Sequence, residues 1–226
     1  RSVLASPLLD APALAPDGSP VTLWPRLDAL DPAGAVPWAD AGALLARLHR
    51  LPVPTDPALG PHAGRALLEQ TRTKAAALKP GGSTDVLRIL IDELLAAWPT
   101  PDPARVTLVQ GDWHLGQIGR IPGTDTLVLH HSGSLGVGDP AWDLARPAAL
   151  WALGLTEDAG WQTFLAAYSA AGGPAPVPGR AWHALDHPAR CAVARLAVDE
   201  IARDETSLSP VAETLLSAAV KMVGWR

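Results

Sequence analysis

Two segments decide the fold: TLVQGDWHLGQIGRI at residues 107–121 and VLHHSGSLGVGDPAWDLA at residues 128–145. In the first, apolar or β-branched residues lead into a Gly-Asp turn at Asp112, and apolar residues resume after a short polar loop. This pattern predicts β-type runs at 105–110 and 126–131, which would form an inserted β-hairpin whose loop carries Asp112. A carboxylate on such a loop can act as a general base, or it can simply cap the turn.

The composition indicates a globular chain of mild acidity. Of 226 residues, 48% are hydrophobic and 18% are charged, and the net charge is −5. This balance argues against a general nucleic-acid binder, which normally presents a basic face. No apolar run reaches the ~18 residues that cross a bilayer, and the first residues lack the apolar core of a secretion signal, so a cytoplasmic protein is expected. The single cysteine, Cys191, excludes an internal disulfide and a multi-cysteine zinc site.

The remainder of the chain predicts an N-terminal hairpin followed by a mostly helical body. Residues 12–24 favour a hairpin because Pro16-Asp17-Gly18 is a turn sequence. Helical periodicity starts at Trp38 and places Ala41, Leu44, Leu45, Leu48 and Leu51 on one stripe. Further helices are expected at 63–78, 84–98, 140–153, 158–171, 180–203 and 210–224. Pro188 should kink or split the helix at 180–203. The fold class is therefore α+β.

The two quoted segments resemble the active-site region of the aminoglycoside phosphotransferase and choline kinase family, which is related to the protein kinases. That family reads H-G-D-x-x-x-x-N, then an Asp on the next strand, then G-D-P-x-x-D-L-A; this chain has QGDWHLGQ and GDPAWDLA. The segment ARLHRLP at 46–52 also resembles a helix end common in the family. The resemblance implies a protein-kinase-like fold, with a reduced β lobe and hinge at 1–27 and a helical large lobe at 28–226.

The resemblance also implies a role for each matched residue. Asp112 falls on the catalytic base that accepts the proton of the substrate hydroxyl. Gln117 stands where the family has its metal-binding Asn, and His131 stands where it has a second metal ligand, an Asp. The residues expected to support the site are Gln110, in place of the usual His, and the paired aspartates Asp139 and Asp143.

ATP with Mg²⁺ and a small acceptor bearing hydroxyl or amine groups are implied in the same way, but the altered residues should weaken them. A neutral imidazole at His131 lacks the charge and the hard oxygen that Mg²⁺ prefers. The nucleotide-binding hinge is expected at Leu23, Trp24 and Arg26, yet the first 73 positions hold no lysine and no Gly-rich loop to bind phosphates. We therefore expect weak or absent transfer; the alternative is an active kinase whose small lobe lies outside this sequence.

Two motifs suggest other chemistry. SGSLG at 132–136 nearly matches the G-x-S-x-G nucleophile elbow, which would make Ser134 the nucleophile of a serine hydrolase. His114, His130 and His131 suggest zinc. However, adjacent residues of a regular strand point to opposite faces, so His130 and His131 cannot both bind one ion there.

Overall fold

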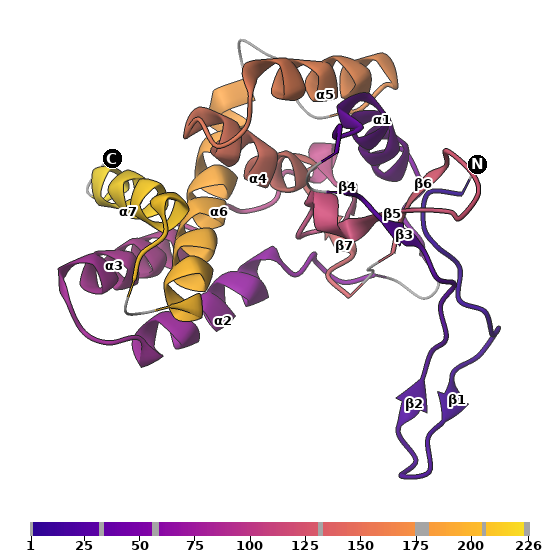
Figure 1. The fold of residues 1–226 in the computed structure, drawn as a ribbon, viewed down its shortest axis with the longest axis horizontal. Coiled ribbons are helices and arrows are strands. Elements are labelled where there is room, and N and C mark those ends of the chain that lie inside the picture. The colour runs from indigo at the N-terminus through magenta and orange to yellow at the C-terminus, as the bar shows by residue number, and fades with distance from the viewer. Residues whose placement is uncertain are drawn as a thin grey trace.

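The computed structural model describes residues 2–31, 34–55, 59–130, 133–174, 181–204 and 207–223. Across these residues the chain forms seven α-helices, two 3-10 helices and seven short strands, which confirms the predicted α+β class (Figure 1). The α-helices are α1 (Trp38–His49), α2 (Gly64–Ala77), α3 (Gly82–Ala96), α4 (Ala141–Ala152), α5 (Asp158–Ala170), α6 (Ala181–Arg203) and α7 (Pro210–Met222). The 3-10 helices are η1 (Pro103–Arg105) and η2 (Leu115–Gln117).

In the described part of the chain the strands form three small antiparallel sheets. Their pairings are β1 (Ala13–Leu14) with β2 (Pro20–Val21), β3 (Asp28–Ala29) with β5 (Ile118–Arg120) and β5 with β6 (Leu127–Leu129), and β4 (Thr107–Val109) with β7 (Gly136–Gly138). The start of the chain lies beside β6. The N–H of Ala5 donates to the carbonyl of Leu129, and the N–H of Leu129 donates to the carbonyl of Val3.

The hairpin predicted around Asp112 is wrong in its pairing. β4 pairs with β7, so that Leu108 lies opposite Val137, whereas β5 and β6 form a hairpin that begins after the Asp112 loop. Asp112 therefore lies on the connection between two sheets and not at the tip of one hairpin. The sequence could not show this, because strands of three residues carry almost no periodic signal and their partners are set by the path of the whole chain.

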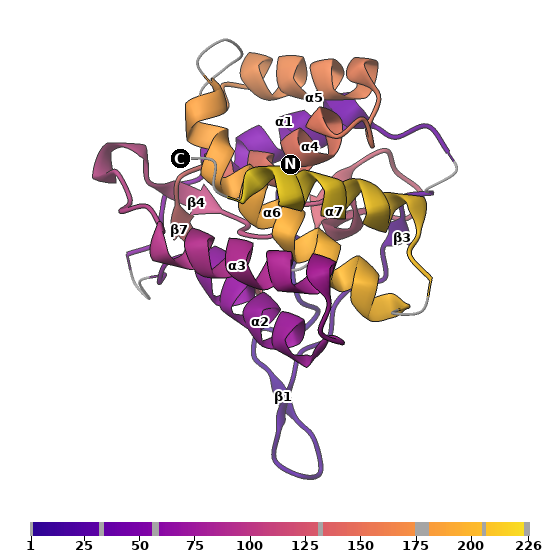
Figure 2. The same cartoon turned by 90° about the vertical axis from the view of Figure 1, so that its left-hand side faces the viewer.

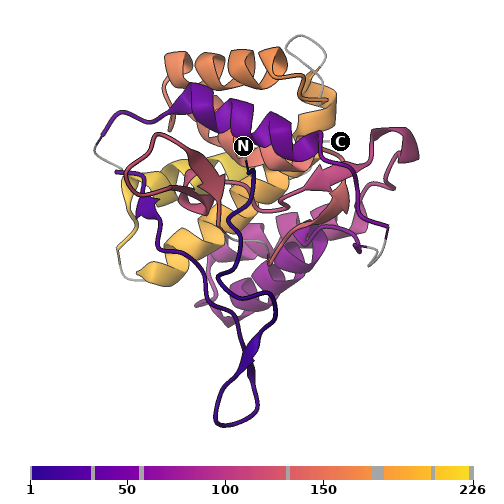
Figure 3. The ribbon, with the colours of Figure 1, turned by 90° about the vertical axis from the view of Figure 1, so that its right-hand side faces the viewer.

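The N-terminal hairpin is present at the predicted place. Gly18 has a φ of 82°, and the carboxylate of Asp17 accepts hydrogen bonds from the backbone and the hydroxyl of Ser19. Figures 1 and 3 show β1 and β2 extending away from the helical body. Leu14 at the hairpin is 75% exposed. This arm therefore carries apolar surface that the rest of the described chain does not cover.

Two hydrophobic cores lie in the helical body. The first joins α1, α5 and the strands near the Asp112 loop, and it contains Trp113 and Phe164 with ring centroids 5.0 Å apart. The second joins α2, α3, α6 and α7 around residues such as Leu68 and Ile91. Figure 2 shows α2 and α3 side by side with α6 and α7. Helix α4 contributes to both cores, which places it at the centre of the body.

Two predictions about single helices need correction. Leu44, Leu45 and Leu48 are fully buried as the α1 stripe requires, but Leu51 is 36% exposed because the helix ends at His49. Helix α6 runs unbroken through Pro188, so of the two outcomes predicted there, a kink or a split, the split does not occur. None of the helices in the described ranges is long and apolar enough to span a membrane.

Candidate functional site

The Asp112 loop leaves β4 through a turn that only glycine fits. Gly111 has a φ of +81°, in the left-handed region, and a Cβ added there would lie 2.5 Å from the carbonyl oxygen of Ser134. After this turn the backbone N–H of Asp112 donates a 2.7 Å hydrogen bond to Oε1 of Gln110. The local sequence Gln-Gly-Asp thus sets the direction in which the Asp112 side chain leaves the loop.

A buried aspartate from α4 holds the same loop in place. Oδ2 of Asp143 accepts the N–H of Gln110 and Oδ1 accepts the N–H of Gly111, each at 2.7 Å. Nε2 of His49 lies 3.0 Å from Oδ2, and Nδ1 of the same ring lies 2.7 Å from the hydroxyl of Tyr168. Asp143 is 0% exposed, so its charge requires these partners. Both carboxylate oxygens of Asp143 accept hydrogen bonds, so its role is to brace the Asp112 loop, that is, to hold it in position.

Ser134 does not lie in a nucleophile elbow. It precedes strand β7, whereas such an elbow is followed directly by a helix. Its hydroxyl receives a 3.2 Å hydrogen bond from Nε2 of Gln110, and no described histidine hydrogen-bonds to it. This geometry argues against the serine-hydrolase alternative. Ser134 instead ties the Asp112 loop to the turn before β7.

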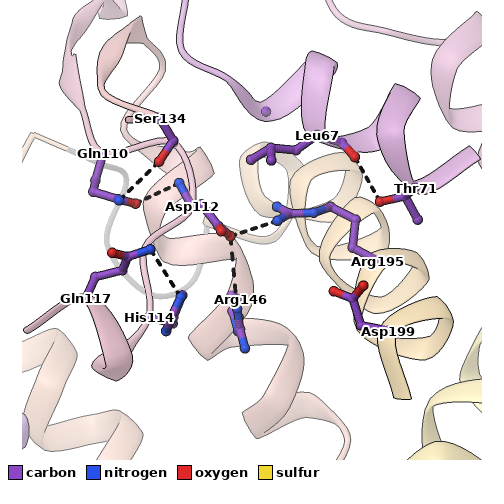
Figure 4. Close-up of polar contacts among 12 residues, drawn as sticks. Leu67, Thr71, Gln110, Asp112, His114, Gln117, Ser134, Arg146, Arg195 and Asp199 are labelled. Carbon is purple, nitrogen blue, oxygen red and sulfur yellow. Dashed lines mark hydrogen bonds and ion pairs between the residues drawn. The ribbon is translucent and has the colours of Figure 1, made fainter. Parts of the chain in front are cut away.

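Two arginines face the carboxylate of Asp112 from the helices α4 and α6 (Figure 4). Nη2 of Arg195 donates a 2.9 Å hydrogen bond to Oδ1 of Asp112, and Nη1 of Arg146 lies 4.0 Å from the same oxygen. These three residues and Asp199 line a pocket of about 30 Å³, which holds only one or two water molecules. The pocket is lined by residues of the Asp112 loop, α4 and α6 and lies within the helical body.

A wider groove of about 590 Å³ lies beside the loop. It is lined by Trp24 from the expected hinge and by Gln117 and His130. In the view of Figure 4, Gln117 and Arg195 lie on opposite sides of Asp112. The other two expected hinge residues do not line this groove. The carbonyl of Leu23 accepts a 2.7 Å hydrogen bond from the N–H of Leu8.

Solved structures share this arrangement of helices and sheets. A spectinomycin phosphotransferase in complex with AMP matches 100% of this chain and 76% of its own, with a TM-score of 0.57 and 13% identity. The choline kinase LicA from Streptococcus pneumoniae matches 97% of this chain and 74% of its own, with a TM-score of 0.57 and 15% identity. A choline/ethanolamine kinase family protein from Mesorhizobium loti matches 97% of this chain and 78% of its own, with a TM-score of 0.54 and 15% identity.

This chain has the fold of the small-molecule phosphotransferases. The expected protein-kinase-like architecture is thereby confirmed. At these identities the likeness concerns the fold alone. No protein-family model and no curated protein sequence matches the chain.

The side chain of Gln117 lies beside His114 in the same loop. Its Nε2 lies 3.2 Å from Nε2 of His114, while its Oε1 is buried and has no hydrogen-bond partner among the described residues. A buried amide oxygen without a partner can serve as one ligand for Mg²⁺. His131, the other expected ligand, lies outside the described residues.

The described residues do not otherwise fit a magnesium site. Asp139 is bound by Arg105 at 3.1 Å and accepts the N–H of Ala141 at the start of α4, and both oxygens of Asp143 are engaged. Across the described ranges no group of three or more His, Cys, Asp or Glu residues could hold a metal ion. A single neutral oxygen on Gln117 cannot replace the carboxylate that such a site needs.

Sequence reasoning missed the two arginines of the pocket at Asp112. Arg146 directly follows the GDPAWDLA segment, so its position in the sequence could have indicated that it lies near the site. Arg195 lies 83 positions after Asp112, and nothing in the local sequence indicates that the two meet. Burial lowers the pKa of Arg146, and the nearby Asp112 carboxylate opposes that change.

Proposed function

We propose that this chain is a phosphotransferase-like protein of the aminoglycoside phosphotransferase and choline kinase family, related to ATP-dependent small-molecule kinases and weak or inactive in phosphoryl transfer. The observation that carries the proposal is the Asp112 loop, held by Asp143 through two backbone hydrogen bonds on a phosphotransferase fold. The cytoplasmic location expected from the composition belongs to the same proposal. So does the division into a β-lobe remnant and hinge at 1–27 and a large lobe at 28–226.

Asp112 is the proposed general base. The acceptor's hydroxyl or amine would lose its proton to this carboxylate as it bonds to the γ-phosphorus of ATP, while the bond from that phosphorus to the ADP oxygen breaks. Oδ1 of Asp112 is engaged by Arg195, and Oδ2 accepts no hydrogen bond from a described residue. Oδ2 is therefore the oxygen that can receive the proton.

The groove at Trp24 and Gln117 is the proposed nucleotide site. Its volume of about 590 Å³ lies in the range of small-molecule pockets. The indole of Trp24 is 41% exposed and offers an aromatic face on which a purine can stack. The spectinomycin phosphotransferase with the same fold was solved with AMP, which supports an adenine nucleotide as the ligand.

Weak transfer follows from the residues near this groove. Bound Mg²⁺ would neutralise charge on the transferred phosphoryl group, but no described Asp or Glu lines the groove, and Gln117 offers only a neutral oxygen there. A positioned base supplies about 10²–10⁴-fold in rate, so Asp112 alone cannot replace that neutralisation.

The test is calorimetric titration of Mg·ATP, combined with ATP turnover assays on aminoglycosides, choline and sugar amines. We expect affinity weaker than micromolar, reduced further by Trp24→Ala, and turnover close to background. Leu14→Ala, on the exposed hairpin outside the groove, is the matched control. Micromolar affinity with turnover that Asp112→Asn abolishes would show an active kinase instead. Absence of any nucleotide binding would remove the proposed function.

A further inference from the structure

Arg146 is a cation that lacks a hydrogen-bonded partner within the described chain. Its Nε is buried and makes no hydrogen bond, and its nearest carboxylate oxygen, on Asp112, is 4.0 Å away. A guanidinium carries five N–H donors and no acceptor. A partly buried charge is costly unless it is paired, so Arg146 lies in a place that an added anion would stabilise.

Arg195 presents further unused donors to the same pocket. Among the described residues it makes one hydrogen bond, of 2.9 Å, to Oδ1 of Asp112, and its side chain is 20% exposed. The second carboxylate of the pocket, Asp199, is already paired with Lys74 at 2.9 Å. When Lys74 is counted with the two arginines, three cations accompany the two carboxylates of this cavity, and the local balance is positive.

We propose that the arginine pocket, defined by Asp112, Arg146 and Arg195, selects an acceptor that carries an acid group. A carboxylate or phosphate of the acceptor would bind to the two guanidinium groups, and a hydroxyl of the same molecule would face Asp112. The ligand class is a small hydroxy acid or a phosphorylated polyol. This inference rests on the proposed function, because it names the acceptor for the same base. A cationic acceptor such as choline or an aminoglycoside would be repelled here.

The position of the pocket assigns the anion to the acceptor and not to ATP. The residues that line the arginine pocket do not line the groove at Trp24 and Gln117, and Figure 4 shows Gln117 and Arg195 on opposite sides of Asp112. An acid group reaching the arginines would come from the α4 and α6 side. The nucleotide would come from the groove at Trp24 and Gln117.

Binding would also release the base. The cavity of about 30 Å³ has room for one or two water molecules only, so the side chains around it must move apart to admit an acid group. The acid group would then take over the hydrogen bond that Arg195 now gives to Asp112. That exchange would free Oδ1 and keep the guanidinium paired. The acceptor would thus free the second oxygen of the base, and in its absence Oδ1 of Asp112 stays hydrogen-bonded to Arg195.

The experiment is calorimetric titration of the whole chain with glycerol 3-phosphate and lactate, against glycerol and choline as probes that lack an acid group. We expect the two anions to bind and the other two to bind at least tenfold more weakly. Arg146→Gln and Arg195→Gln should each reduce anion affinity about 10–100-fold, the size expected for lost charge-assisted hydrogen bonds. The matched control Arg120→Gln removes an arginine paired with exposed Asp125, outside the pocket, and should leave affinity unchanged.

Two further measurements distinguish the possible reasons for a negative result: anion binding in the presence of nucleotide, and binding by the arginine variants. Saturating ADP or ATP should leave anion binding intact; loss of anion binding with nucleotide would show that the arginines hold a nucleotide phosphate and would overturn the inference. Choline binding as tight as the anions, or anion affinity unchanged in Arg146→Gln, would also overturn it. If Arg146→Gln does not fold, Arg146→Lys keeps the charge without the planar fork and should still lose most of the affinity.

The same experiments can refute the proposed phosphotransferase function without refuting the anion pocket, and the reverse. Anion binding that depends on both arginines, without any nucleotide binding, would support the pocket and defeat the phosphotransferase proposal. Transfer of phosphate to choline or an aminoglycoside would support the phosphotransferase proposal and defeat the pocket as the selector of acid groups.

Discussion

The imidazole of His49 lies 3.0 Å from the carboxylate of Asp143, although 94 positions separate the two residues. This contact joins the end of α1 to the first turn of α4, and both side chains are buried. Asp143 also accepts hydrogen bonds from the N–H groups of Gln110 and Gly111, and these bonds fix the position of the Asp112 loop. The two segments that resemble the phosphotransferase family, ARLHRLP and GDPAWDLA, therefore meet at one buried interaction.

Asp143→Asn should destabilise the protein. An asparagine offers one acceptor oxygen where the carboxylate uses two, so one buried N–H in the loop loses its partner, at a cost of about 1–3 kcal/mol. Urea unfolding would measure the change as a lower midpoint. Asp125→Asn, at a fully exposed position, is the control and should change stability by less than about 0.5 kcal/mol. Equal midpoints for Asp143→Asn and wild type would show that the brace contributes nothing.

Asp112→Asn should remove residual transfer without weakening nucleotide binding. An amide cannot accept the acceptor's proton, so any measurable turnover should fall by at least about 10²-fold. The nucleotide groove lacks Asp112 among its lining residues, so Mg·ATP affinity should stay within about twofold by calorimetry. Turnover that survives the substitution would mean that another residue acts as the base.

Restoring the family residues at the altered positions should strengthen metal-nucleotide binding. The double variant Gln117→Asn with His131→Asp supplies a carboxylate and a shorter amide, the hard oxygen donors that Mg²⁺ prefers. We expect Mg·ATP affinity to rise at least about tenfold, while affinity for ATP with EDTA stays constant. An unchanged Mg·ATP affinity would show that these positions do not bind the metal.

Cys191 should be unreactive in the folded protein. Burial raises the pKa of its thiol to about 12, so the thiolate that reacts with iodoacetamide is scarce near neutral pH. It is the only cysteine, which makes mass spectrometry of the whole chain a direct readout. Labelling should appear only after urea unfolding; rapid labelling of the native protein would contradict this. Because Cys191 also lines the pocket at Asp112, faster labelling with an added acceptor would report its opening.

Stability should fall as the pH drops through about 6.5. Burial lowers the folded-state pKa of His62 and of His187 below the ordinary value of 6.5. Between the folded pKa and 6.5 the unfolded chain binds more protons than the folded one, so unfolding is favoured as pH falls and stability is regained as pH rises. Urea midpoints across this range should decline less steeply for His62→Gln and His187→Gln than for wild type. Parallel slopes would show that these rings do not control the effect.

The local features of this protein follow from its amino-acid sequence alone. The helices at 158–171 and 210–224 were predicted to within two residues of α5 and α7, because apolar periodicity reports the buried face of a helix directly. The turn at Gly111 and Asp112 was equally local, since it depends on the backbone freedom of one glycine. The motif segments, through their resemblance to a family, also predicted the protein-kinase-like fold that the solved structures share.

Which distant groups meet depends on the packing of the folded chain. β4 pairs with β7 and not with the strand that follows the Asp112 loop, and Arg195 reaches Asp112 from 83 positions away. Short strands and single arginines carry no periodic signal, and their partners are set by how α4 and α6 pack in the core. Backbone preference acts over a few residues, whereas strand pairing and charge pairing act through space. The hydrogen bond between Arg195 and Asp112 therefore depends on the tertiary structure and cannot be predicted from the local sequence.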